Sequence, residues 1–366
     1  MSGTVYRNSV KVKGELAAPS VPSYMKMASP VAGYSETTGQ NRTGNAVLAP
    51  NGKIYCIPGK STTSLGITVL DPLTGETEEL DCGTWFGWTI ALAPDGIIYC
   101  FSSGSNGRVM TINPETHEVN TSHQTFTGTD NYLGCALHPN GLIYCAPADA
   151  TSVGVYDYVT NTFTVAPTGL TGLPAGTDKW YGCCVAPSGK IYCAPYGHNS
   201  VLIIDPYTPS VDYTTMASFS TYTDTGWRRG NLAPNGKIYF APRDSSSVLI
   251  VDPSTDTADE TTITGLGVSG NKYCQGILAP NGKIYCLPIY KKNVLIIDPM
   301  TDTVDTTTYT GFDSGDYKYY FSILGPNGKI YSQGWGIYFY KMLELTPGGI
   351  PILPIEPLLS PYVNHG

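Results

Sequence analysis

Aromatic residues recur at one position of this sequence with a regularity that could build a binding surface. The position lies seven residues before each of seven similarly placed prolines and holds, in chain order, Thr43, Gly87, Tyr132, Trp180, Trp227, Tyr273 and Tyr319. Flat amphipathic Tyr and Trp rings stack on sugars and anchor protein partners, and an adjacent arginine adds hydrogen bonds. The ligand contacts predicted on this ground, with one tryptophan offset by a residue, are Tyr132, Trp180, Trp227, Tyr273, Tyr319, Trp88 and Arg228. The alternative is that the rings wedge between neighbouring repeats.

No group of residues forms a recognisable catalytic or metal-binding set. A general base or a metal ion needs several partners, and the five histidines are scattered singly along the chain. His138 stands before a turn proline, where a packing role is expected. His198, Asp149 and Asp244 lie in equivalent loops, but the sequence does not show whether they meet. We predict no catalytic residue, no metal ligand and no cofactor.

The cysteines mark a packing position. Five of the ten directly follow a repeated tyrosine, and Phe240 and Ser332 replace them in two other copies. A position that accepts Cys, Phe or Ser is expected to pack in a core, so we predict buried, reduced thiols. The expected hairpin register also places Cys135 opposite Cys145 and Cys183 opposite Cys193, and it leaves open whether these pairs are ever oxidised.

A repeat positions all of these residues. Its most regular feature is a proline that stands two residues before a glycine and five before a tyrosine, at Pro50, Pro94, Pro139, Pro187, Pro234, Pro280 and Pro326. The spacings are 44, 45, 48, 47, 46 and 46 residues, a period typical of stacked or circular repeat proteins.

The sixth copy predicts the structure of one repeat. Its expected strands are 273–279, 283–288, the apolar 294–297 and the polar 303–311, and a tight turn at 280–282 joins the first two. Apolar inner strands and a polar outer strand are typical of a propeller blade. The sequence therefore predicts an all-β protein, a seven-bladed β-propeller of four-stranded antiparallel blades.

The last copy lacks a polar fourth strand, so another segment must close the ring. Counting back from Pro50 places that strand at about residues 24–34. The predicted organisation is an N-terminal arm over residues 1–44 that includes this closing strand, a propeller over 45–346, and a proline-rich C-terminal tail over 347–366.

The repeat resembles a known family. The patterns VLIIDPxTxTVxTT and LAPNGKIYCxP are similar to the repeats of YVTN/NHL-like seven-bladed propellers over residues 45–345. That resemblance implies the fold and only broad functions, because such propellers include enzymes, scaffolds and adhesive surface proteins. A lactonase-type enzyme would carry a Glu/Asp/Asn/His set at the channel mouth, and no such set matches residue by residue. The near-identical copies and the apolar ending at 358–364 also resemble tailed-phage virion structural proteins.

Composition narrows the function. The net charge is −8, no basic cluster exceeds two residues, and no long apolar run or apolar leader is visible. We therefore expect neither nucleic-acid binding nor membrane insertion. The favoured hypothesis is a non-catalytic binding or structural propeller, a virion-surface or host-attachment component that recognises a cell-surface glycan or a protein. It would join a larger assembly through the N-terminal arm and the C-terminal tail, and it would be located in the virion after assembly in the host cytoplasm.

Two alternatives remain open. One is a propeller enzyme of the lactonase or lyase type that acts at the channel mouth. The other is an intracellular protein-interaction scaffold, which would be located in the cytoplasm.

Overall fold

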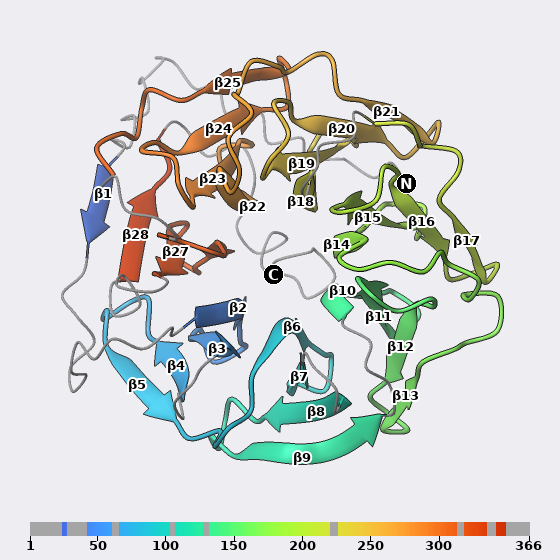
Figure 1. Cartoon of the computed structure of the whole chain (residues 1–366). Coiled ribbons are helices and arrows are strands. Elements are labelled where there is room, and N and C mark those ends of the chain that lie inside the picture. Colours follow the sequence, from blue (N-terminus) through green and yellow to red (C-terminus); the bar gives the residue numbers. More distant parts are fainter. Residues whose placement is uncertain are drawn as a thin grey trace, which may run out of the picture.

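The computed structural model describes residues 24–27, 42–60, 66–102, 107–126, 132–219, 226–312, 318–334 and 342–348. Within these ranges the chain forms seven four-stranded antiparallel sheets and no helix. Figure 1 shows the sheets arranged as blades of a ring around a common axis, and we call the region around this axis, between the inner strands, the channel. The predicted seven-bladed β-propeller is therefore confirmed. Among the described segments no helix is long and apolar enough to span a membrane.

Each blade runs from an inner strand beside the channel to an outer strand at the rim of the ring. Blade one has β2 (Arg42–Leu48), β3 (Ile54–Lys60), β4 (Ile67–Leu70) and β5 (Thr77–Leu80). Blade two has β6 (Gly87–Leu92), β7 (Ile98–Ser102), β8 (Gly107–Ile112) and β9 (Val119–Phe126). Blade three has β10 (Tyr132–Leu137), β11 (Ile143–Pro147), β12 (Gly154–Asp157) and β13 (Thr162–Thr164). Blade four has β14 (Trp180–Val185), β15 (Ile191–Pro195), β16 (Leu202–Asp205) and β17 (Ser210–Asp212).

The remaining three blades complete the ring. Blade five has β18 (Trp227–Leu232), β19 (Ile238–Pro242), β20 (Leu249–Asp252) and β21 (Thr257–Asp259). Blade six has β22 (Tyr273–Leu278), β23 (Ile284–Pro288), β24 (Leu295–Asp298) and β25 (Thr303–Asp305). Blade seven has β26 (Ile323–Leu324), β27 (Ile330–Gln333), β28 (Met342–Thr346) and β1 (Tyr24–Met27).

The Pro-Asn-Gly segment forms the predicted hairpin. In blade six Leu278 pairs with Ile284, and the amide of Ala279 donates to the carbonyl of Lys283 at 2.9 Å. Gly282 has a φ of 76°, which explains why glycine stands there. We call the end of the ring that carries these hairpins the turn end. The opposite end carries the loops that enter the inner strands and the loops between second and third strands, and we call it the loop end.

The outer strand of blade six is shorter than the sequence predicted. The fourth strand of blade six ends at Asp305 and not at Gly311. The reason is local, because the Asp305 carboxylate accepts the backbone amides of Thr307 at 2.6 Å and Thr308 at 3.1 Å and so turns the chain. Asp212 and Asp259 end β17 and β21 in the same way.

The ring is closed by the N-terminal segment. β1 pairs with β28, with Tyr24 opposite Thr346, and it forms the outer strand of blade seven. The repeat count predicted the closing strand at about residues 24–34, and the described residues of that segment, Tyr24–Met27, do form it. Because β28 runs towards the turn end, the chain enters β1 and leaves β28 at that end. In agreement, the side-chain amide of Asn281 in the blade-six turn donates to the carbonyl of Gly348.

The repeated Asn and Tyr link neighbouring blades at the turn end. Asn327 donates from its side-chain amide to the carbonyl of Pro72 at 3.0 Å, and the Tyr331 hydroxyl donates to the same carbonyl at 3.1 Å. These bonds cross from blade seven to blade one. Equivalent bonds run from Asn51 to Pro114 and from Asn235 to Pro299. The conspicuous motif therefore contributes stability between blades as well as a turn.

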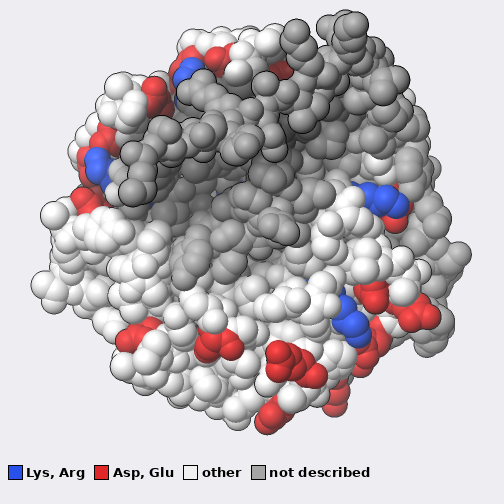
Figure 2. Space-filling view, turned by 180° about the vertical axis from the view of Figure 1, so that it is seen from behind, with Lys and Arg blue, Asp and Glu red and all other residues white. Residues whose placement is uncertain are grey.

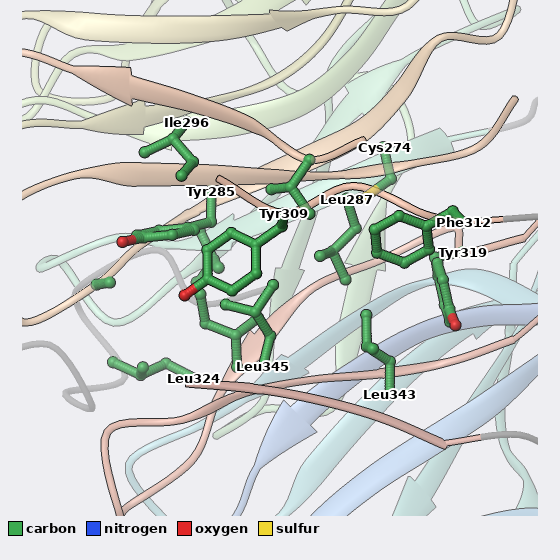
Figure 3. Packing of buried hydrophobic residues seen from close by; sticks show 14 of the residues in the cluster. Cys274, Tyr285, Leu287, Ile296, Tyr309, Phe312, Tyr319, Leu324, Leu343 and Leu345 are labelled. Atoms are coloured by element: carbon green, nitrogen blue, oxygen red, sulfur yellow. The ribbon is translucent and has the colours of Figure 1, made fainter. Parts of the chain in front are cut away.

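The hydrophobic core is divided among the blade interfaces. Seven clusters of buried residues occur in the described part, and each joins two neighbouring blades. Figure 3 shows the cluster between blades six and seven, in which Tyr285 and Tyr309 of blade six lie next to Leu345 of blade seven, and Leu287 lies near Leu343. Because each interface is packed with large side chains, the positions of inner-strand residues from different blades are fixed relative to one another.

Candidate binding site

The five repeated aromatic residues do not form an exposed rim. Their exposed fractions are 3% or less, and each belongs to a cluster between a different pair of blades: Tyr132, Trp180, Trp227, Tyr273 and Tyr319. The indole nitrogens of Trp180 and Trp227 donate to the carbonyls of Ser200 at 2.8 Å and Ser247 at 2.7 Å. This is the wedge arrangement that the sequence offered as the alternative, and it corrects the expectation of an open ring of aromatic faces.

The next residue of the inner strand has a different environment. Trp88, Tyr181, Arg228 and Tyr320 each lie one position after the repeated aromatic site, in blades two, four, five and seven. They contact one another although most of these blades are not neighbours in the ring. We call these four residues the channel cluster. It lies near the start of the inner strands, at the loop end of the channel.

A β-bulge separates the two environments. In β18 Trp227 pairs with Pro242 and Gly230 pairs with Phe240, so the strand carries one extra residue between these pairs. A bulge redirects the side chains around it and is common next to functional sites. It directs Trp227 between blades while its neighbour Arg228 reaches the channel.

Arg228 lies at the centre of the channel cluster. Its guanidinium carbon is 3.9 Å from the centroid of the Tyr320 ring and 5.0 Å from that of Tyr181. The Trp88 and Tyr320 ring centroids are 5.3 Å apart. Arg228 is 0% exposed, whereas Trp88 and Tyr320 are half-buried and form the part of the cluster that solvent reaches.

The Arg228 guanidinium is charged and has few hydrogen-bond partners among the described residues. Burial by itself would lower its pKa, but the neighbouring hydroxyl groups of Tyr320, Tyr181 and Tyr196 raise the pKa above its usual value. The Tyr320 hydroxyl acts on it as a side-chain hydrogen-bond partner, and beyond that group its nitrogens Nε, Nη1 and Nη2 have no partner among the residues that the structure describes. A buried cation is ordinarily paired or hydrogen-bonded, so this group needs an explanation.

Other cations at the loop end are used within the protein. The Lys179 ammonium donates to the carbonyls of Ala148 and Gly176 at 2.9 and 3.0 Å. Lys318, at the equivalent position of blade seven, donates to Tyr290 at 3.2 Å. Lys272 donates to Ser269 at 3.1 Å, and burial lowers its pKa to about 8. These ammonium groups hold loops in place.

The candidate acid and base residues are also occupied by local contacts. Asp149 accepts the backbone amide of Asp178 at 2.8 Å, and Asp244 pairs with Arg243 at 2.7 Å. His198 stacks on Trp180 with ring centroids 4.8 Å apart, and burial, aided by the Lys179 ammonium, lowers its pKa. The described residues contain no group of three or more His, Cys, Asp or Glu side chains arranged to hold a metal ion.

His138 and the cysteines have packing roles. The His138 ring is buried, and its Nε2 lies 2.9 Å from the carbonyl of Gly189 in the next blade. All ten cysteines are buried thiols. The predicted register is confirmed for both pairs, Cys135 with Cys145 and Cys183 with Cys193, and the sulfurs of the second pair are 3.5 Å apart.

Comparisons with known proteins support the fold. No family model and no curated protein sequence matches the chain, so the resemblance to YVTN/NHL-like propellers stays a prediction. A solved streptogramin B lyase is similar with a TM-score of 0.67 at 13% identity, over 88% of this chain and 97% of that one. Virginiamycin B lyase from Staphylococcus aureus also has a TM-score of 0.67, at 10% identity over 89% of this chain and 100% of that one. The RRP9 WD40 repeats have a TM-score of 0.59 at 11% identity, over 88% of this chain and 99% of that one. At such identities these likenesses concern the fold alone.

Proposed function

We propose that this protein is a non-catalytic binding propeller that attaches to a larger assembly at its turn end and receives a ligand at its loop end. The observation that carries this proposal is the separation of two features. The chain enters β1 and leaves β28 side by side at the turn end, because Tyr24 pairs with Thr346. The channel cluster around Arg228 lies at the other end of the ring.

The attachment part of the proposal rests on topology. The closing strand belongs to the same blade as the last strand of the chain, so the N-terminal arm and the C-terminal tail start from one place on the ring. Two segments that start together can engage one partner jointly, which raises the apparent affinity beyond that of either segment. An assembly held in this way would leave the loop end free. A virion surface, which the resemblance to phage structural proteins suggested, is the setting we propose.

The attachment is tested by removing the arms while keeping the ring. A tagged full chain and a variant without residues 1–23 and 349–366, which retains β1 and β28, would be expressed in the native source and separated on a density gradient. We expect the full chain to sediment with large particles and the trimmed chain to remain as free protein with an unchanged melting temperature. A folded trimmed chain that still sediments with the particles would refute attachment through the arms.

The two alternatives differ in what they bind or convert. An intracellular scaffold would show no binding on a glycan array, whereas the proposed attachment protein would bind a glycan or a surface protein through its loop end. The lyase alternative draws on structural neighbours that share the fold at low identity. Stoichiometric Ca²⁺ or Zn²⁺ in the purified protein would favour the enzyme over the binding propeller.

A further inference from the structure

The guanidinium of Arg228 is a feature of the loop end that the packing of the fold does not explain. Arg228 is fully buried, and apart from the Tyr320 hydroxyl its three nitrogens lack hydrogen-bond partners among the described residues. Leaving buried charged donors unsatisfied costs more than leaving neutral ones unsatisfied. An arginine used only to fill space would be replaced without loss by an apolar side chain of similar volume.

The surrounding rings stabilise the charge but leave most of the donors unused. Tyr320 lies over the guanidinium at 3.9 Å and Tyr181 lies 5.0 Å away. Such contacts act through the faces of the aromatic rings and favour a cation. The N–H groups of a guanidinium lie in its own plane, in a fork that fits the two oxygens of a carboxylate or a phosphate. The stacking therefore holds the fork in a fixed orientation for an oxyanion.

No carboxylate of the described residues takes this role. The Asp244 carboxylate is engaged by Arg243 at 2.7 Å and by the backbone amide of Asn271. Asp149 is engaged by the backbone amide of Asp178. The tyrosines Tyr320, Tyr181 and Tyr196 raise the pKa of Arg228. Arg228 therefore makes no ion pair with a carboxylate of the described residues.

The charge of the whole protein makes this cation a local feature. The chain carries a net charge of −8, and Figure 2 shows acidic side chains along the outer rim of the described surface on one face. Anions are therefore not attracted to the protein as a whole. An anion that binds must be held by short-range contacts with a few groups.

We infer that Arg228 is the anchor of an oxyanion site that accepts the carboxylate or phosphate of a small sugar-like ligand. The ligand's ring would lie on Trp88 and Tyr320, which are half-buried and stack beside each other next to Arg228. The oxyanion would reach the guanidinium if these two side chains rotate. The inference rests on the proposed function, since it names the ligand class of the same loop end.

The choice of probe distinguishes a ligand with a carboxylate from a ligand with a phosphate. N-acetylneuraminic acid and glucuronate carry a carboxylate on a sugar ring, and glucose 6-phosphate carries a phosphate. Glucose is the matched neutral sugar, and inorganic phosphate is the anion without a ring. Each would be titrated into the full chain by calorimetry. We expect at least one charged sugar to bind, and the neutral sugar to bind about tenfold or more weakly.

The residue is tested with three variants. Arg228→Met removes the buried charge and should lower the affinity for the charged sugar about 10- to 100-fold. Arg228→Lys keeps a charge but loses the planar fork, and about a tenfold loss is expected. Arg108→Gln alters an exposed arginine on β8 and should leave the affinity unchanged.

The outcomes separate this inference from the proposed function. Equal binding of charged and neutral sugars, unchanged binding by folded Arg228→Met, or no binding of any probe by the folded native chain would each overturn the oxyanion site. None of these results would alter the sedimentation of the full and trimmed chains, which tests attachment. If Arg228→Met does not fold, the Arg228→Lys comparison decides the question.

Discussion

The guanidinium carbon of Arg228 lies 3.9 Å from the centroid of the Tyr320 ring, although the two residues belong to blades five and seven. A contact between blades that are not neighbours crosses the central channel. Deeper in the channel, the Gln275 amide donates to Asn45 at 3.3 Å and links blades six and one. The channel is thus crossed by side chains, and Arg228 is a buried charged group at its loop end.

The aromatic wedges are expected to stabilise the ring. Trp180→Ala removes a fully buried ring between blades three and four and should lower the free energy of unfolding by about 3–5 kcal/mol. Trp88→Ala is the matched control, because the same substitution at a half-buried ring removes less packing. Urea unfolding of both variants tests this, and equal losses would contradict the assignment of Trp180 as a wedge.

The links at the turn end give a second prediction. Asn327→Ala removes the bond to the carbonyl of Pro72 and should cost about 1–2 kcal/mol of stability. Asn140→Ala is the control, because the described contact of the Asn140 amide is with Tyr144 of its own blade at 2.9 Å. Thermal unfolding measures both. A loss at Asn140 as large as that at Asn327 would show that the bond between blades adds nothing.

The turn glycines give a third prediction. Gly236 has a φ of 81° and open space around the position of a Cβ atom, so a substitution there is opposed by backbone conformation alone. Gly236→Val should lower the free energy of unfolding by about 1–2 kcal/mol. Gly236→Asn should cost less, since asparagine tolerates a positive φ. Equal stability of the native chain and the valine variant would refute the turn geometry.

Acid should destabilise the outer strands. Burial alone would raise the pKa of Asp212, Asp259 and Asp305, but hydrogen bonds from the threonines two and three residues later lower each pKa to about 2. Because these folded-state values lie below the ordinary value near 3.8, the contribution to stability is present above about pH 4. It is lost as the pH falls from about 4 to about 2.

The acid prediction is tested by replacing all three aspartates with asparagine. The triple variant should be less stable than the native chain at pH 7, and its free energy of unfolding should fall less between pH 4 and pH 2. Unfolding in urea at several pH values gives both quantities. If the free energy of unfolding falls equally with pH in the two proteins, these carboxylates do not contribute to acid sensitivity.

The sequence predicted the features that depend on local pattern and on the period. The turn at Gly282 and the closing strand at Tyr24–Met27 follow from residue types and from counting blades. The direction of side chains at the start of each inner strand could not be predicted in this way. A bulge after Trp227 adds one residue to the strand, so simple alternation does not say which of two neighbours faces the channel.

The site residues were nevertheless within reach of the sequence. Two of the predicted ligand contacts, Trp88 and Arg228, stand one residue after the repeated aromatic position and belong to the channel cluster. Tyr181 and Tyr320 stand at the same position in their own repeats, so an alignment of the repeats at this position contains all four residues. The sequence does not predict that these four side chains contact one another across the channel, because their positions depend on the packing of seven blade interfaces.

The central claim, that Arg228 binds an oxyanion, is tested most directly by the melting temperature in two salts. The native chain and Arg228→Met would be unfolded in phosphate and in chloride at equal ionic strength. Phosphate also stabilises proteins by exclusion from their surface, and both chains share that effect. The account predicts that phosphate, compared with chloride, raises the melting temperature of the native chain more than that of the variant. The reason is that only the native site gains a bound ligand. An equal rise in both proteins would contradict it.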